Sequence, residues 1–177
     1  MIELFRGDIT TLHVDAIVNA ANSSLTPGGA VGLAIHRAAG PELEAECRTL
    51  PGLHPGGAAL TRAYRLPAKY VIHAVGASWH GDPRAAEQLA STYRRCFELA
   101  AVHDVRTMAF PAISCGLYSF PARLGAEVAI RETAAALDRS ASLEKVIFAL
   151  FTDAVYAAFE EALQDYRPVP DCGGNAV

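Results

Sequence analysis

A glycine-rich segment gives the first sign of chemistry in this sequence. Gly28, Gly29 and Gly32 follow a short apolar run and precede a pattern typical of a helix. Glycines at the start of a helix leave backbone N–H groups exposed at the positive end of the helix dipole, where anions bind. Two interpretations stay open here: a site for a phosphate group, or a tight turn that closes a strand–helix unit. The spacing matches neither GxGxxG nor GxxxxGKS/T.

Polar side chains lie close to this segment in the sequence. Asn19 and Asn22 come at the end of the preceding strand, and an amide offers both a donor and an acceptor to a pair of sugar hydroxyls. The alternative for either asparagine is an Asx turn. Asp8 directly follows the first strand, where its carboxylate can accept a hydrogen bond from an exocyclic amine such as that of adenine. Its alternative is a cap or turn residue.

A second loop follows a later strand and leads into another helix. Ser114, Cys115 and Gly116 add backbone donors there, and Tyr118 or Phe120 could form an apolar lid. A cysteine near a helix start has features of a thiolate nucleophile. A cysteine phosphatase also needs an arginine shortly after the cysteine, and none follows Cys115. We therefore favour a packed, inert thiol.

The histidines and cysteines show no metal-binding pattern. No two histidines have the i, i+4 spacing of a metal-binding helix, and no CxxC pair occurs among the four cysteines, which are Cys47, Cys96, Cys115 and Cys172. His36 lies on the helix after the glycines, and His73 interrupts an apolar strand, where we expect a hydrogen-bonded core histidine. We predict neither a metal site nor a cofactor.

Strands and helices alternate along the chain. Apolar runs predict strands at Ile2–Phe5, Ala16–Val18, Tyr70–Ala74, Met108–Phe110 and Val146–Phe151, with a weaker candidate at Ala58–Tyr64. Helical spacing of apolar residues covers 86–101, the segment that opens at Pro121, and 155–166. This order predicts a layered α/β domain with a largely parallel sheet, whose ligands bind beyond the carboxyl ends of the strands.

Composition limits the remaining possibilities. The 177 residues are 51% hydrophobic and 19% charged, and the net charge is −4. A chain of this size forms one domain, expected at 1–167 with a flexible tail at 168–177. Its acidity argues against nucleic-acid binding. The absence of a signal-peptide pattern, of a long apolar run and of a disulfide pattern predicts a cytoplasmic protein with no membrane partner.

Five segments together resemble the macro domain family, specifically its MacroD-type branch, which includes O-acetyl-ADP-ribose deacetylases. They occur in the family's order and spread over nearly all of residues 1–166: GDIT at 7–10, VDAIVNAANSSL at 14–25, AIHRAAG at 34–40, LPAKYVIHAVG at 66–76 and FPAISCGLYSFP at 110–121. The resemblance implies a three-layer α/β/α fold with a mixed, mostly parallel central sheet and a cleft for ADP-ribose.

The resemblance also assigns roles by position. Asp8, with the Ile9 backbone, would hold the adenine amine, Phe151 would line the adenine pocket, and Asn22 would bind the distal ribose. The diphosphate would be wrapped by the backbones of Gly28, Gly29, Ala30, Val31, Gly32, Ser114, Cys115, Gly116, Leu117 and Tyr118. The partners it implies are ADP-ribose, O-acetyl-ADP-ribose and mono-ADP-ribosylated proteins.

One departure from the family pattern bears on catalysis. Hydrolytic MacroD-type proteins carry an aspartate, thought to orient or activate water, at the position of Gly32, and a glycine at that of Leu33. A positioned base contributes about 10²- to 10⁴-fold to a rate. We expect metal-free hydrolysis of ADP-ribosyl or O-acetyl-ADP-ribose esters, with Asn22 and His36 as catalytic residues and the substrate's diphosphate holding the water. The alternative is a non-catalytic or very slow reader of ADP-ribose.

Overall fold

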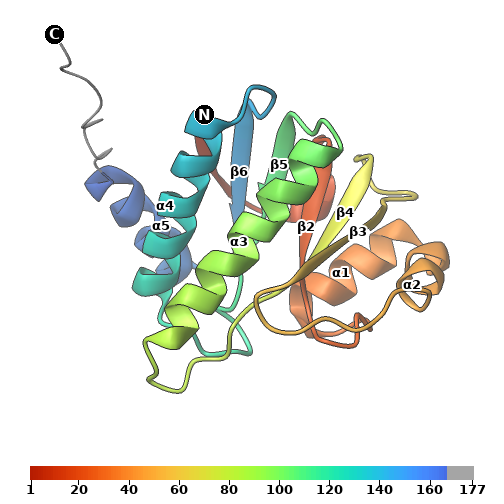
Figure 1. Cartoon of the computed structure of the whole chain (residues 1–177), viewed down its shortest axis with the longest axis horizontal. Helices are drawn as coiled ribbons and strands as arrows, with labels where there is room; N and C mark the ends of the chain where they lie inside the picture. Colours follow the sequence, from red (N-terminus) through yellow and green to blue (C-terminus); the bar gives the residue numbers. More distant parts are fainter. Residues whose placement is uncertain (167–177) are drawn as a thin grey trace, which may run out of the picture.

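A computed structural model of the chain describes residues 1–166, in which strands and helices alternate (Figure 1). The elements in chain order are β1 (Ile2–Arg6), the 3-10 turn η1 (Ile9–Thr11), β2 (Ala16–Ala21), α1 (Gly29–Ala39), α2 (Pro41–Cys47), β3 (Ala58–Arg62), β4 (Tyr70–Val75), α3 (Arg84–Val102), β5 (Thr107–Phe110), α4 (Ala122–Arg139), β6 (Lys145–Leu150) and α5 (Asp153–Asp165). The tail predicted at 168–177 lies outside the described residues.

The six strands form one mixed sheet in the order β1-β6-β5-β2-β4-β3. Every neighbouring pair is parallel except β3 and β4, which are antiparallel. The predicted three-layer α/β/α fold with a mostly parallel sheet is confirmed.

Alternation of side chains along the central strands explains the layers. In β2, Ala16 and Val18 pack into the core beneath α3, α4 and α5, whereas Ile17 and Ala21 pack into a second core beneath α1 and α2. Successive residues of a strand point to opposite faces, so a central strand must be apolar on both. Figure 1 shows α3 and α4 across one face of the sheet, with α1 and α2 grouped beside β2, β4 and β3.

The sequence pattern missed one helix. α2 has seven residues, three of which are glutamates, so it carries no long apolar stripe. Pro41 at its first position and Gly40 before it mark its start, and only Leu43 and Cys47 are buried. Within residues 1–166, no helix combines the length and the apolar character needed to cross a membrane.

Candidate functional site

The carboxyl edge of the parallel strands gathers the predicted site residues. Four adjacent strands, β1, β6, β5 and β2, run in the same direction and end at this edge. Asp8 and Ile9 follow β1, and Phe151 follows β6. The two glycine-bearing loops follow β2 and β5. This edge, the rim, therefore carries residues that are far apart in the sequence, as expected for a binding site in a parallel sheet.

The first loop presents the amino terminus of α1. Gly28 is the N-cap and supplies no side-chain cap, so the first-turn N–H groups have no acceptor within the helix. Gly29 has φ of 66°, a left-handed conformation that favours glycine. Ala30 is exposed and Val31 is half-buried. The geometry supports the anion-binding interpretation, with a dipole and free donors at the same point.

The second loop faces the first one directly. Among residues 114–118, only Cys115 donates its N–H to another group of residues 1–166, namely the carbonyl of Ala112 at 3.2 Å. The side chain of Leu117 is 85% exposed. Its Cδ1 atom lies 3.6 Å from where a Cβ of Gly29 would be. The two loops thus meet, and each carries backbone N–H groups without an acceptor within residues 1–166.

Gly76, at the end of β4, lets the second loop pack closely. A Cβ on Gly76 would lie 2.1 Å from Ser114 Oγ and 2.7 Å from Ile113 Cγ2. Ser114 itself is buried and has φ of 68°. Gly116, by contrast, has nothing within 4 Å of its Cβ position and is open on that side. The second loop is therefore tightly packed at Ser114 and open at the Cβ position of Gly116.

The other end of the rim carries Asp8, Ile9 and Phe151. Asp8 Oδ1 accepts hydrogen bonds from the N–H and the hydroxyl of Thr10, at 2.9 and 2.8 Å. The capping alternative for Asp8 is therefore present, and Oδ2 accepts no hydrogen bond from residues 1–166. Ile9 is buried. Phe151 is 84% exposed, an unusual position for a phenylalanine that fits a face for a flat aromatic ligand.

The amide of Asn22 is engaged within its own loop. Its Nδ2 donates to the carbonyl of Thr26 at 3.0 Å, and its Oδ1 accepts from the N–H of Thr26 at 3.1 Å and the hydroxyl of Ser24 at 3.0 Å. The turn-forming alternative thus describes Asn22 in this structure. To bind a sugar hydroxyl, the amide must exchange some of these bonds for ligand contacts.

Buried polar groups lie beneath the first loop, between the sheet and α1. Asn19 is 3% exposed, and its Nδ2 lies 3.2 Å from Nδ1 of His73. His73 also contacts the hydroxyl of Thr61 at 3.0 Å, which confirms the predicted hydrogen-bonded core histidine. Burial, with a smaller effect of neighbouring His36, lowers the pKa of His73 to about 4. His73 is therefore neutral at physiological pH.

His36 belongs to the same buried layer. It is 8% exposed, and neither ring nitrogen has a partner among the described residues. Burial lowers its pKa, and Glu44 only partly opposes that effect. Gly32 lies one helical turn earlier, and its Cβ position is 3.5 Å from Asn19 Oδ1. Residue 32 thus faces the polar layer, but as glycine it contributes no side chain.

The thiol of Cys115 is packed rather than reactive. Its Sγ atom lies 2.7 Å from the Cβ position of Gly125 on α4. Burial raises its pKa to about 11, so the thiol stays protonated at neutral pH. The suggestion that Phe120 forms a lid is wrong. Phe120 is 3% exposed and packs against Trp79, with ring centroids 5.1 Å apart.

Sequence reasoning missed several supporting residues. Thr26 forms hydrogen bonds with the amide of Asn22, and Gly76 makes room for Ser114. The backbone N–H of Trp79 donates to the carbonyl of Tyr118 at 2.9 Å. Only Gly76 had a local signal, a glycine directly after a buried strand, which marks a close approach of backbone.

Comparisons with known proteins agree with this geometry. The family profile described as Macro domain matches residues 18–129. The chain is 47% identical over 169 residues to the O-acetyl-ADP-ribose deacetylase of Klebsiella pneumoniae, covering 93% of this chain and 97% of that one. It is 47% identical over 171 residues to the ADP-ribose glycohydrolase MACROD1 of Bos taurus, covering 95% of this chain and 53% of that one. The Trypanosoma brucei macrodomain, solved in complex with ADP-ribose, superimposes with a TM-score of 0.86 at 38% identity, covering 92% and 68% of the two chains.

Proposed function

The chain belongs to the macro domain family, and from that membership we propose that it binds ADP-ribose and hydrolyses mono-ADP-ribosyl esters on proteins, O-acetyl-ADP-ribose, or both. The observation that carries the proposal is the contact of two glycine-bearing loops at the sheet edge, each with backbone N–H groups that have no acceptor within residues 1–166. A diphosphate is the anion that two such sets of donors can share.

The rest of the nucleotide follows from the order of the strands. The adenine end lies toward β1 and β6. There Asp8 Oδ2 accepts a hydrogen bond from the exocyclic amine, and the exposed ring of Phe151 stacks on the base. The distal ribose lies toward Asn22 and α1. The ligand is thus oriented with its adenine near β1 and its distal ribose near the end of β2.

Hydrolysis at this site relies on positioning. Water attacks the anomeric carbon of the distal ribose, the bond from that carbon to the ester oxygen breaks, and a carboxylate leaves with the electron pair of that bond. The proton lost by the water passes to the solvent. A carboxylate leaves readily, so orientation of the two reactants supplies much of the rate. Asn22 holds the ribose, and the ligand's diphosphate holds the water. Neutral His36 lies in the layer beneath, where it supports the ribose end of the cleft.

The absence of a carboxylate at residue 32 favours a second function. Gly32 places no acid beside the ribose end, and Asp8, the one acidic residue among the predicted site residues, follows β1 at the other end of the edge. Without a positioned base the rate falls by about 10²- to 10⁴-fold. A protein that binds mono-ADP-ribosylated partners without releasing them is therefore the alternative. A cytoplasmic location stays a prediction.

Two measurements separate these functions. The purified protein is titrated with ADP-ribose by calorimetry and incubated with a mono-ADP-ribosylated protein, with Asn22→Ala as the control. Hydrolysis predicts binding together with release of free ADP-ribose faster than with the control. Binding with no release above the control supports the reader, and absence of binding contradicts both functions.

A further inference from the structure

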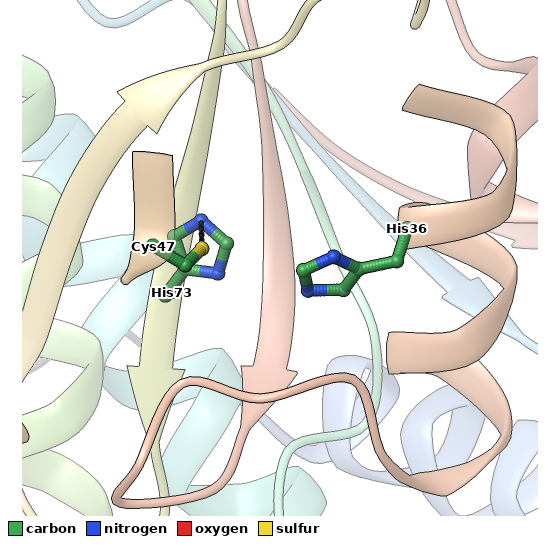
Figure 2. A group of neighbouring side chains, drawn as sticks. All are labelled: His36, Cys47 and His73. Atoms are coloured by element: carbon green, nitrogen blue, oxygen red, sulfur yellow. Dashed lines mark hydrogen bonds between the residues drawn. The ribbon is translucent and has the colours of Figure 1, made fainter. Parts of the chain in front are cut away.

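Three ligand-type side chains from three different elements meet behind the first loop. Cys47 ends α2, His73 lies in β4, and His36 lies in α1. One potential ligand atom of each lies within 4.8 Å of the others, and all three residues are buried. Figure 2 shows the ring of His36 pointing from α1 toward Cys47 and His73, which already contact each other through Sγ and Nε2 at 3.6 Å.

Two residues at this cluster, His36 and Asn19, keep polar atoms that the described residues do not satisfy. Both ring nitrogens of His36 and the Oδ1 atom of Asn19 are buried without a hydrogen-bond partner among the described residues. Buried polar atoms are almost always paired, and an unpaired one carries a desolvation cost of about 1–3 kcal/mol. A histidine that is more than nine-tenths buried, unpaired and directed at a thiol and a second imidazole points to a ligand between them.

We propose that Cys47 Sγ, His73 Nε2 and one ring nitrogen of His36 form a binding site for a thiolate-preferring divalent cation of the zinc type. One thiolate and two imidazoles are a ligand set that zinc favours over magnesium or calcium. With Zn–S bonds of about 2.3 Å and Zn–N bonds of about 2.0 Å, tetrahedral ligand atoms lie about 3.3–3.6 Å apart. Cys47 Sγ and His73 Nε2, at 3.6 Å, already fit this spacing, so His36 is the ligand that must move closer. Rotation of the unpaired His36 ring, which breaks no hydrogen bond, supplies part of that movement.

The protonation states suit this ligand set. Both histidines have lowered pKa values and are neutral, which is the form that binds metal. Burial raises the pKa of the Cys47 thiol to about 11, so the cation must displace its proton, which passes to the solvent. One proton is therefore released for each cation bound.

Neighbouring residues complete the surroundings of the site. The amide of Asn19 touches Nδ1 of His73. With that amide turned over, Oδ1 accepts a hydrogen bond from the Nδ1–H group while Nε2 binds the cation, which is the usual arrangement around a metal-bound histidine. Thr61 Oγ1, 3.0 Å from Nε2, lies where a fourth ligand or a bound water can be held. The site shares His36 with the proposed ribose end, but its argument rests on the three ligand side chains and not on ADP-ribose binding.

Cobalt(II) is the probe that tests the site, since it replaces zinc and reports thiolate binding by its absorption. Chelator-treated full-length protein is titrated with CoCl₂ and then with ZnCl₂. We expect one equivalent of cobalt, a thiolate-to-cobalt charge-transfer band, release of one proton, and loss of the band when zinc displaces cobalt. Cys47→Ser should abolish the band and weaken zinc binding more than about 100-fold. Loss of a residue that only hydrogen-bonds to a metal ligand weakens binding by less than that.

Cys96→Ser is the matched control, because Cys96 is equally buried but lies outside the cluster. It should keep the band. His36→Asn provides a second test, with circular dichroism verifying the fold, and should weaken binding to a similar extent. A wild-type protein without the band, or a band that survives both Cys47→Ser and His36→Asn, overturns the proposal. Binding of ADP-ribose is measured separately, so either proposal can fail alone.

Discussion

Individual glycines decide the shape of the two loops at this edge of the sheet. Gly29 adopts a left-handed conformation beneath Leu117, Gly76 lets Ser114 approach to a distance that a methyl group would prevent, and Gly32 leaves the polar layer without a carboxylate. The first two shape the binding loops, and the third affects the rate of any reaction. These effects are separable by substitution, because each glycine has different neighbours.

Gly32→Asp should increase hydrolysis of a mono-ADP-ribosyl ester by roughly 10²-fold or more, since it adds a base beside the ribose end. The new Cβ meets only Asn19 Oδ1, at an ordinary contact distance of 3.5 Å, so the fold should tolerate it. Release of ADP-ribose over time measures the effect. Gly32→Asn, with nearly the same shape and no charge, is the control. Equal rates for Gly32→Asp and wild type would show that a base at residue 32 is not what limits this protein.

Gly76→Ala should weaken ADP-ribose binding at least tenfold and lower stability by about 1–3 kcal/mol, the usual cost of overpacking. The added methyl overlaps Ser114 Oγ and Ile113 Cγ2, so the second loop must move. Calorimetry gives the affinity and urea unfolding gives the stability. Gly116→Ala, whose methyl meets nothing within 4 Å, should leave the stability unchanged. Wild-type affinity in Gly76→Ala would argue against the role of this loop.

At the scale of elements, one carboxylate joins three strands at the amino edge of the sheet. Asp15 Oδ2 accepts the N–H groups of Arg106 and Thr107 at 2.9 and 3.1 Å, and Oδ1 lies 2.8 Å from Lys69 Nζ. Asp15 precedes β2, Lys69 precedes β4, and Thr107 begins β5. Burial alone would raise the pKa of Asp15, but the hydrogen bonds from Lys69, Arg106 and Thr107 outweigh it and lower the pKa.

This lowered pKa predicts acid sensitivity. A carboxylate with a lower pKa in the folded state stabilises the fold above its unfolded pKa of about 3.9, and that contribution is lost as the pH falls through the folded value. Asp15→Asn should reduce the free energy of unfolding at neutral pH by about 1.5–3 kcal/mol and make stability less dependent on pH in the acid range. Urea unfolding between pH 7 and acid pH measures this.

Asp138→Asn is the comparison, because Asp138 is exposed on α4 and makes no ion pair within residues 1–166. It should behave as wild type. An Asp15→Asn protein with unchanged stability and an unchanged acid limb would show that the three-strand link contributes little.

The elements also show what sequence can and cannot predict. Strand positions were predictable because β2, β4 and β6 are buried on both faces and so are continuously apolar. α2 was not, because seven residues with three glutamates give no helical stripe. The rim followed from the strand order and the glycines. The hydrogen bonds of Asn22 and the His36–Cys47–His73 cluster could not be predicted from the sequence. Side-chain orientation and contacts between distant elements leave no signature in local residue spacing.

At the scale of the whole molecule, the sign of the net charge does not determine the charge of the proposed ligand. The chain has a net charge of −4, yet the proposed ligand is an anion. Neutral backbone amides and a helix dipole resolve this difference, because they bind phosphate without a basic surface. Binding that depends on many lysines and arginines weakens steeply with salt, whereas short-range hydrogen bonds in a cleft are screened much less.

Calorimetric titration with ADP-ribose at low and at high salt therefore tests the central claim most directly. The two-loop cleft predicts saturable one-to-one binding, with an affinity that changes less than about tenfold between the two salt concentrations. It also predicts weaker binding in Gly76→Ala. Absence of heat at millimolar ADP-ribose, or binding that disappears at high salt while Gly76→Ala binds as wild type, would contradict a cleft built from main-chain donors.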